Sequence, residues 1–384
     1  MRAQNPQDQI VGPDSVFLPG SDQFILASSL VLLVVALLVA IASLWLRRRR
    51  RKRDKPKRRP VGFVASAVMV AIALIAGILA WPPPFSVPEF PALPRLFDDN
   101  AFFYREVGDL QVAENSSAAV EALGGLPLIA YASAEVGSGK VAGKPFNFVD
   151  DSTQRYAVSF SFPAGSDEGE YPISDPAYIQ SMPLFGTDEH YIGIDVTGGR
   201  MWEMWAIRNW FGDWHAGSGA IWDLDSLQYP KGRTTASGFP MQPMSFTWEQ
   251  VRSGQVDHAI FAGSPVVGPE AIWPARASDG PSEDPDAPPM GTWFRLRADV
   301  ELTQLGPQAR VIAEAMRTHG VVLGDTGGNF SLSGTPDARW DDDDLDTLKT
   351  LSTDDFEVLD TSELMVREGS MEVRQPDGTG VGEQ

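Results

Sequence analysis

The chain of 384 residues contains no cysteine and only four histidines. The absence of cysteine excludes disulfide bonds, thiolate metal sites and a cysteine nucleophile. A domain of roughly 250 residues needs no such cross-links even in an oxidising compartment, because its core is large enough to outweigh chain entropy. The sequence also lacks a phosphate-binding loop, since GSGK at residues 137–140 has no upstream glycine and is followed by Val141.

Basic side chains are scarce beyond the first 60 residues. From Pro82 onward there are 47 acidic and 19 basic side chains, whereas residues 47–60 carry eleven Lys or Arg and one Asp. An acidic surface repels nucleic acid, so nucleic acid is excluded as a partner of the large C-terminal region. Cations and neutral polymers remain possible partners.

Two long runs contain no charged residue. Phe24 to Leu46 has 23 residues and Val61 to Trp81 has 21, which matches the roughly 20 residues that a helix needs to cross a bilayer. The pattern predicts a two-helix transmembrane hairpin. A cleaved signal peptide is the alternative for the first run, but the run lacks a basic segment before it and leads into an arginine block.

The basic loop at residues 47–60 predicts the orientation of the hairpin. Positive charge in a short loop is retained in the cytoplasm, so both termini and the large domain are expected outside a two-pass plasma-membrane protein. Anionic lipids of the inner leaflet are a nearer partner for this loop than nucleic acid.

The composition divides the chain into seven expected segments. They are a short extracytoplasmic N-terminus (1–23), transmembrane helix 1 (24–46), the basic cytoplasmic loop (47–60), transmembrane helix 2 (61–81), a stalk with six prolines (82–97), a β-sandwich domain (98–362) and a disordered tail (363–384).

Period-two hydrophobicity dominates the large domain. Residues 155–162, 190–196, 200–207 and 292–301 alternate apolar and polar side chains, which is typical of half-buried strands. Helix is sparse: Pro307 to His319 has one apolar face, and a short turn is expected after Asp341. The pattern predicts a mainly-β domain built as an antiparallel β-sandwich.

Several sequence blocks in residues 100–361 resemble a largely uncharacterised family of secreted or surface bacterial proteins. The blocks are TDEHYIGID (187–195), GSGAIWDLDS (217–226), GQVDHAI (254–260), PPMGTWFRLRADVEL (288–302) and SGTPDARW (333–340). The resemblance implies a jelly-roll or lectin-like β-sandwich. This chain departs from the family at Ala277 and Thr326, where the family usually carries His and Asn.

Four residues are candidates for acid and base catalysis. A tight turn at Gly198-Gly199 places Glu203 on the same sheet face as His190, and an early strand start adds Asp188. Two carboxylates and an imidazole on one face suit acid–base work on a sugar or cation binding. His258 is a possible fourth member. Hydrogen bonding inside the sheet is the alternative role for all four.

Tryptophan is concentrated in residues 202–222, which hold five of the eleven. Exposed indoles stack on sugar rings, so a ligand-binding role is a hypothesis for the first four, with core packing as the alternative. These are Trp202, Trp205, Trp210 and Trp214.

No cofactor and no metal site is indicated by a motif. The aspartates at residues 341–344 suggest a divalent cation such as calcium, but four adjacent carboxylates cannot converge on one ion, and helix capping is the other interpretation.

Two functions therefore remain open. The first is a membrane-anchored, non-catalytic surface protein whose ectodomain binds glycan or an envelope protein. The second is a cell-surface carbohydrate-active enzyme, a glycoside hydrolase or polysaccharide lyase. The departures from the family at Ala277 and Thr326 favour the first.

Overall fold

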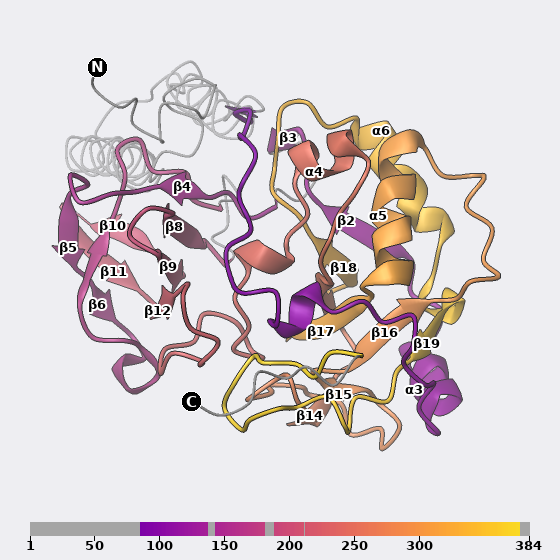
Figure 1. Ribbon diagram of the computed structural model, residues 1–384. Coiled ribbons are helices and arrows are strands. Elements are labelled where there is room, and N and C mark those ends of the chain that lie inside the picture. The colour runs from indigo at the N-terminus through magenta and orange to yellow at the C-terminus, as the bar shows by residue number, and fades with distance from the viewer. Residues whose placement is uncertain (1–84, 137–142, 181–187, 211, 377–384) are drawn as a thin grey trace, which may run out of the picture.

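The computed structural model describes residues 85–136, 143–180, 188–210 and 212–376. These residues form a mainly-β fold in two neighbouring groups of strands (Figure 1). The helices in the described part of the chain are α3 (Ser116–Leu123), α4 (Trp248–Ser253), α5 (Pro307–Thr318) and α6 (Asp342–Leu345), together with the 3-10 turns Phe102–Tyr104, Pro163–Gly165, Gln242–Met244, Asp346–Thr350 and Thr353–Asp355.

A six-stranded sheet forms the larger group, with the order β19-β16-β17-β13-β18-β2. Its strands are β2 (Leu128–Tyr131), β13 (Ile260–Ser264), β16 (Trp293–Leu296), β17 (Val321–Thr326), β18 (Phe330–Ser333) and β19 (Phe356–Val358). The pairs β13–β17 and β18–β2 are parallel, and the other pairs are antiparallel.

A four-stranded sheet organises the other group, with the order β12-β9-β8-β4. Its strands are β4 (Asn147–Phe148), β8 (Tyr191–Asp195), β9 (Arg200–Trp205) and β12 (Ser218–Asp223). Smaller ribbons surround the two sheets. They are β1 (Phe85–Ser86) with β3 (Glu135–Val136), β5 (Arg155–Ala157) with β7 (Glu170–Pro172), β6 (Ser159–Phe160) with β10 (Arg208–Trp210) and β11 (Asp213–Ala216), and β14 (Gly268–Ala271) with β15 (Pro289–Met290).

The two main sheets share one hydrophobic core. Ile192 and Trp222 of the four-stranded sheet belong to the same buried cluster as Phe261, Trp293 and Val322 of the six-stranded sheet. Because side chains alternate along a strand, the neighbours of these residues point to the outer faces. Both sheets are therefore buried on two sides.

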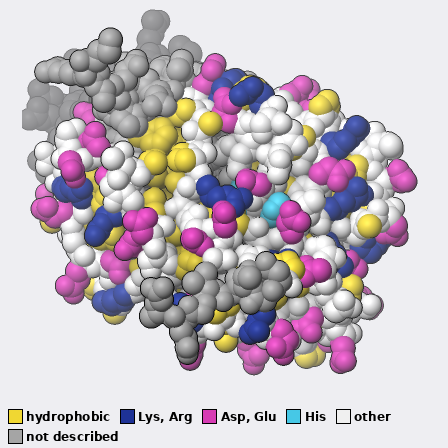
Figure 2. All heavy atoms as spheres, in the orientation of Figure 1, with side chains coloured by type: hydrophobic (Ala, Val, Ile, Leu, Met, Phe, Trp, Pro, Cys, Tyr) yellow, Lys and Arg dark blue, Asp and Glu magenta, His cyan; other side chains and the backbone are white. Residues whose placement is uncertain are grey.

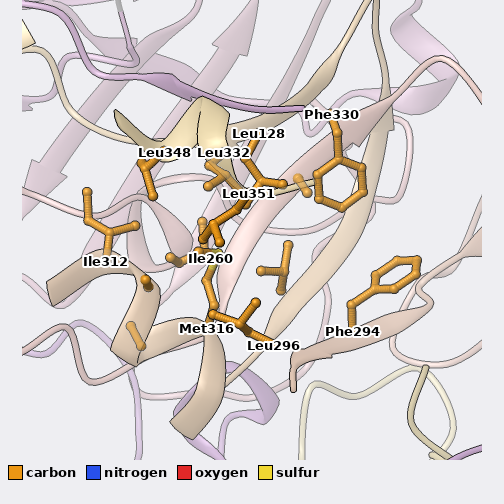
Figure 3. Packing of buried hydrophobic residues seen from close by; sticks show 14 of the residues in the cluster. Leu128, Ile260, Phe294, Leu296, Ile312, Met316, Phe330, Leu332, Leu348 and Leu351 are labelled. Carbon is orange, nitrogen blue, oxygen red and sulfur yellow. The ribbon is translucent and has the colours of Figure 1, made fainter. Parts of the chain in front are cut away.

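The outer face of the six-stranded sheet is covered by α5. Ile312 and Met316 of this helix pack in one cluster with Ile260, Phe294 and Leu296 of the sheet (Figure 3). The helix was predicted at residues 307–319, and the structure confirms it with Pro307 in the first turn. The expected turn after Asp341 is also present as α6.

The expected antiparallel jelly-roll sandwich is wrong, although the mainly-β content is confirmed. Three strand pairs in the two main sheets are parallel, and α5 covers one sheet face. The alternation in residues 292–301 also predicted a longer strand than the structure has, because β16 ends at Leu296 and Ala298 is exposed.

The turn between β8 and β9 is longer than predicted. Asp195 pairs with Arg200, so residues 196–199 form the loop and Glu203 faces Ile192; a two-residue turn at Gly198-Gly199 would have placed it opposite Ile194. The Asp195 carboxylate accepts a hydrogen bond from the Gly198 amide at 2.7 Å, which stabilises this wider turn. The register moved by an even number of residues, so the face of Glu203 was predicted correctly.

The proline-rich segment is not a free stalk in its described part. Val87 and Phe90 are buried, and the Phe90 ring packs 4.9 Å from that of Phe146. The Phe90 amide also donates to the Asp337 carboxylate at 2.8 Å. Proline favours extended backbone, but the apolar residues between the prolines bury themselves against the domain.

The expected disordered tail is ordered up to residue 376. Met371 and Val373 are fully buried, and bridges join Ser370 to Gln228 and Glu372 to Ala101. The high charge of this segment suggested disorder, yet Leu364, Met371 and Val373 belong to the core between the sheets.

The two-helix transmembrane hairpin and the two-pass plasma-membrane localisation are not supported. Over residues 85–136, 143–180, 188–210 and 212–376, no helix combines the length and apolar character needed to span a bilayer. The expected spans at 24–46 and 61–81, the basic loop and the N-terminus lie outside the described residues.

Candidate functional site

An open depression lies where β9 ends and β11 continues into β12. It encloses about 300 Å³ and is lined by Ser161, Phe162, Trp205, Ala206, Arg208, His215, Ala216 and Gly217. The Phe162 side chain is 59% exposed, and its ring stacks on that of Trp205 at a centroid distance of 6.2 Å and an angle of 29°. We name Phe162 and Trp205 the aromatic platform.

Glycine at position 217 makes room for the platform. A Cβ atom at Gly217 would lie 2.3 Å from a ring carbon of Trp205, which is far inside van der Waals contact. The Trp205 carbonyl also accepts a hydrogen bond from the Gly217 amide at 2.7 Å. The backbone of residue 217 therefore forms the floor on which the indole rests.

Asp188 contacts the platform through the Trp205 indole. The Trp205 indole N–H lies 3.5 Å from the exposed Asp188 carboxylate. Backbone hydrogen bonds from Ala206 to Asp188 at 2.7 Å and from Ile207 to Glu189 at 3.1 Å hold the two chain segments together.

The backbone beside this contact is strained. Glu189 and Ala206 have φ values of 43° and 53°, a region that residues with a side chain rarely occupy. Each such residue costs about 1–3 kcal/mol, and such residues cluster at functional sites. An ion pair between Glu189 and Arg208 at 2.5 Å stabilises the same two backbone segments.

Lys144 is buried between the two sheets. Its ammonium group is buried, lies 3.2 Å from the Ser333 hydroxyl and stands 5.4 Å above the Phe261 ring. Burial lowers the pKa of Lys144, and the negative charges of Asp325, Asp188 and Glu203 oppose that shift. The charges of these three carboxylates therefore offset part of the cost of burying the ammonium group.

Asp325 is the half-buried member of this group. Burial, opposed by the charge of Lys144 and aided by the charges of Asp188 and Asp279, raises the pKa of Asp325 to about 7. A carboxyl group with such a pKa can donate a proton near neutral pH.

Glu203 is held inside the core rather than in the depression. It is fully buried and accepts hydrogen bonds from Trp222 at 3.1 Å, Thr234 at 3.0 Å and the Met241 amide at 2.8 Å. Burial raises the pKa of Glu203 to about 7, and these hydrogen bonds act in the opposite direction. Its contacts link the four-stranded sheet to the segment around residue 241.

His190 is close to the same group but has no free ring nitrogen. Its Nδ1 lies 2.7 Å from the Gln180 side-chain oxygen and its Nε2 lies 3.2 Å from the Thr234 carbonyl oxygen. Burial and the charge of Lys144 lower the pKa of His190 to about 4, against the charge of Asp188. The ring is therefore neutral near pH 7, and its contacts join β8 to residues 180 and 234.

His258 belongs to a different cluster. Its ring contacts the Ala259 carbonyl at 3.0 Å and Gln250 at 3.4 Å, and burial lowers its pKa to about 4. The charged groups that act on it are Asp257, His319 and Arg95, and none of these is among the charges that act on Lys144. The sequence grouped four residues, and the structure brings together Asp188, His190 and Glu203 only.

The four candidate tryptophans also do not lie together at one site. Trp202 and Trp214 are buried, the first beneath Arg155 at 5.2 Å and the second against Tyr156 at 6.0 Å. Trp205 is half-buried and lines the depression. The strand position of Trp210 is described, but its side chain lies outside the described part of the structure.

The aspartates at 341–344 serve as helix caps. The Asp341 carboxylate accepts hydrogen bonds from the amides of Asp343 and Asp344 at the start of α6. The Asp344 carboxylate accepts hydrogen bonds from the first-turn amides of α5, Gln308 and Ala309, both at 3.0 Å. Within the described residues, no three His, Asp or Glu side chains are grouped so as to hold a metal ion.

Sequence reasoning missed three residues of this region. The alternation over residues 155–162 predicted one strand that includes Phe162, but β6 ends at Phe160 and a 3-10 turn follows at Pro163–Gly165. Lys144 follows the GSGK segment. That segment was tested only as a phosphate-binding loop, which it is not, so Lys144 was not selected. Asp325 follows the apolar run VVLG in β17, and an acidic residue near the end of a buried strand was the available signal.

Comparisons with known proteins found no matching family model, no matching curated protein and no matching solved structure.

Proposed function

We propose that the protein binds neutral polysaccharides on the aromatic platform. The observation that supports this function best is the exposure of Phe162, 59% of whose side chain faces solvent while its ring stacks on Trp205. Large aromatic side chains are normally buried, so a stacked pair left open to solvent is typical of a binding surface.

The surroundings of the platform suit a sugar chain. Apolar ring faces pack against the C–H faces of sugars, while polar groups at the rim bind hydroxyls. Arg208 and His215 supply donors in the depression, and Asp188 supplies an acceptor beside the Trp205 indole.

The charge of the domain favours a neutral polymer. Residues 82–384 carry 47 acidic and 19 basic side chains, and acidic side chains are spread over the face drawn in Figure 2. Such a surface disfavours acidic polysaccharides by long-range repulsion, and it imposes no comparable penalty on an uncharged chain.

Retention of the full chain on immobilised polysaccharides tests this function. The panel comprises mixed-linkage β-glucan, xylan, galactomannan and starch, with acidic polygalacturonate for comparison. We expect retention on at least one neutral polymer, and loss of that retention in Phe162→Ala and Trp205→Ala. Ile272→Ala removes an exposed apolar side chain elsewhere on the surface and is expected to retain binding. Equal retention of all variants contradicts the proposal.

A further inference from the structure

The Asp188 carboxylate, at the edge of the aromatic platform, is open to ligand contacts. Asp188 is exposed, and among the residues that the structure describes its side chain has one hydrogen-bond donor, the Trp205 indole N–H at 3.5 Å. An ionised carboxylate has two oxygens with about four acceptor sites. Most of the acceptor sites of Asp188 therefore face solvent.

Backbone hydrogen bonds fix the position of this carboxylate. The Ala206 amide, next to Trp205 in the chain, donates to the Asp188 carbonyl at 2.7 Å, and the Ile207 amide donates to the Glu189 carbonyl at 3.1 Å. These bonds hold the segment that carries Asp188 against the segment that follows Trp205. The carboxylate therefore stays at the nitrogen-bearing edge of the indole.

The basic residue of the depression does not neutralise Asp188. The Arg208 Nε donates to the Glu189 carboxylate at 2.5 Å, and over the described part of the chain Asp188 forms no ion pair with Arg208 or with any other basic side chain. A carboxylate without an ion-pair partner keeps its acceptor sites available to an uncharged ligand.

A pyranose ring presents hydroxyls where Asp188 can accept hydrogen bonds from them. When the ring lies flat on an indole, its C–H groups face the aromatic carbons and its hydroxyls project outwards from the ring edge. Two hydroxyls on adjacent ring carbons lie side by side, so both can donate to the two oxygens of one carboxylate. Hydrogen bonds to an ionised acceptor are roughly twice as strong as those between neutral groups. A pair of adjacent hydroxyls is therefore the sugar feature that matches Asp188 best.

The position of the glycosidic bond decides whether a polymer offers this pair. In a 1,4-linked pyranose chain the hydroxyls on C2 and C3 are both free and adjacent. In a 1,3-linked chain the oxygen on C3 belongs to the glycosidic bond, and the free hydroxyls on C2 and C4 are not adjacent. A site whose acceptor loses its donors on binding disfavours such a ligand.

We infer that Asp188 makes the platform selective for 1,4-linked neutral polysaccharides, by accepting hydrogen bonds from two adjacent hydroxyls of the sugar that stacks on Trp205. This inference rests on the proposed glycan binding and names the substrate class of that site. The two residues have different roles: Trp205 supplies affinity for a pyranose ring of either linkage, and Asp188 supplies the discrimination between linkages.

Retention of the full chain on a linear 1,3-linked β-glucan tests the linkage preference. Each neutral polymer in the panel above contains 1,4-linked units. We expect retention on at least one of them and at least about tenfold weaker binding to the 1,3-linked glucan, which is the effect of losing one charge-assisted hydrogen bond. Equal binding to the 1,3-linked glucan overturns the inference and leaves glycan binding intact. Absence of retention on every neutral polymer is instead a failure of the proposed function.

Blocking the two hydroxyls tests the role of Asp188 at constant linkage. Titration calorimetry compares a hexasaccharide of the retained polymer with the same sugar carrying methyl ethers on the C2 and C3 oxygens. The wild-type protein is expected to bind the methylated sugar at least about tenfold more weakly. Asp188→Ala should bind the unmodified sugar about as weakly and lose no further affinity on methylation, because both changes remove the same hydrogen bonds. Trp205→Ala should weaken binding of both sugars and keep their ratio.

The matched control is Asp286→Ala, which removes an exposed carboxylate between β14 and β15 and is expected to keep the wild-type affinity and preference. Methylation that weakens binding to Asp188→Ala as much as to the wild-type protein contradicts the contact with Asp188 and shows steric exclusion at the platform. Wild-type affinity of Asp188→Ala for the unmodified sugar contradicts it as well. The comparison of the two sugars in the wild-type protein needs no substitution, so it holds whether or not a variant folds.

Discussion

The Trp205 indole N–H lies 3.5 Å from the Asp188 carboxylate. This contact places an acidic side chain at the edge of the exposed aromatic surface that Phe162 and Trp205 form.

Gly217, beneath the platform, gives a prediction in which neither aromatic residue is replaced. Gly217→Ala brings a methyl group to 2.3 Å from the Trp205 ring, so the indole must move. We expect polysaccharide affinity to fall at least about tenfold, which corresponds to about 1.4 kcal/mol of binding free energy. Titration calorimetry measures the change.

The matched control is Gly165→Ala, at the end of the turn that follows Phe162, where an added Cβ meets no atom within 4 Å. It should bind as the wild-type protein does. Equal loss of affinity in both variants would attribute the effect to the backbone rather than to Trp205.

Because the Glu203 carboxyl group is buried, we expect the stability difference between the wild-type protein and Glu203→Gln to depend on pH. Its pKa is about 7 in the fold and about 4.5 in the unfolded chain. Between these values the unfolded chain releases the proton that the folded protein keeps, so stability of the wild-type protein relative to Glu203→Gln falls as the pH rises from about 4.5 to about 7. The expected loss is about 3 kcal/mol. Urea unfolding of both proteins at pH 4, 5.5, 7 and 8 measures it, and a constant difference over this range refutes it.

Asp337 fastens the proline-rich segment to the domain. Its buried carboxylate accepts a hydrogen bond from the Phe90 amide at 2.8 Å and pairs with Arg339 at 2.6 Å. Asp337→Ala leaves both donors without this acceptor, so we expect a loss of about 3 kcal/mol in the free energy of unfolding. Asp346→Ala breaks an exposed pair with Lys349 and should cost less than about 1 kcal/mol. Chemical denaturation compares the two, and similar losses contradict the fastening role.

Local patterns predicted the elements that depend on neighbouring residues. The apolar face and the initial proline identified α5, and the alternation of apolar and polar residues identified β8 and β9. The face of Glu203 survived an error in the turn because the register moved by two residues. The parallel pairing of β13 with β17 was not predictable in this way, since the two strands are more than 50 residues apart and period-two patterning does not specify direction.

The candidate site shows the same division. Asp188, His190 and Glu203 lie within one hairpin region and were found from the sequence. Lys144 and Asp325 come from distant segments, and only the packing of one sheet on the other brings their charges near Asp188. His258 was added as a possible fourth member, but the charges that act on it are those of Asp257, His319 and Arg95.

Titration calorimetry of the full chain with the retained neutral polysaccharide tests glycan binding at Trp205 most directly. We predict that Trp205→Ala weakens binding at least about tenfold relative to the wild-type protein, while Ile272→Ala leaves the affinity unchanged. Wild-type affinity in Trp205→Ala would contradict the aromatic platform as the binding surface.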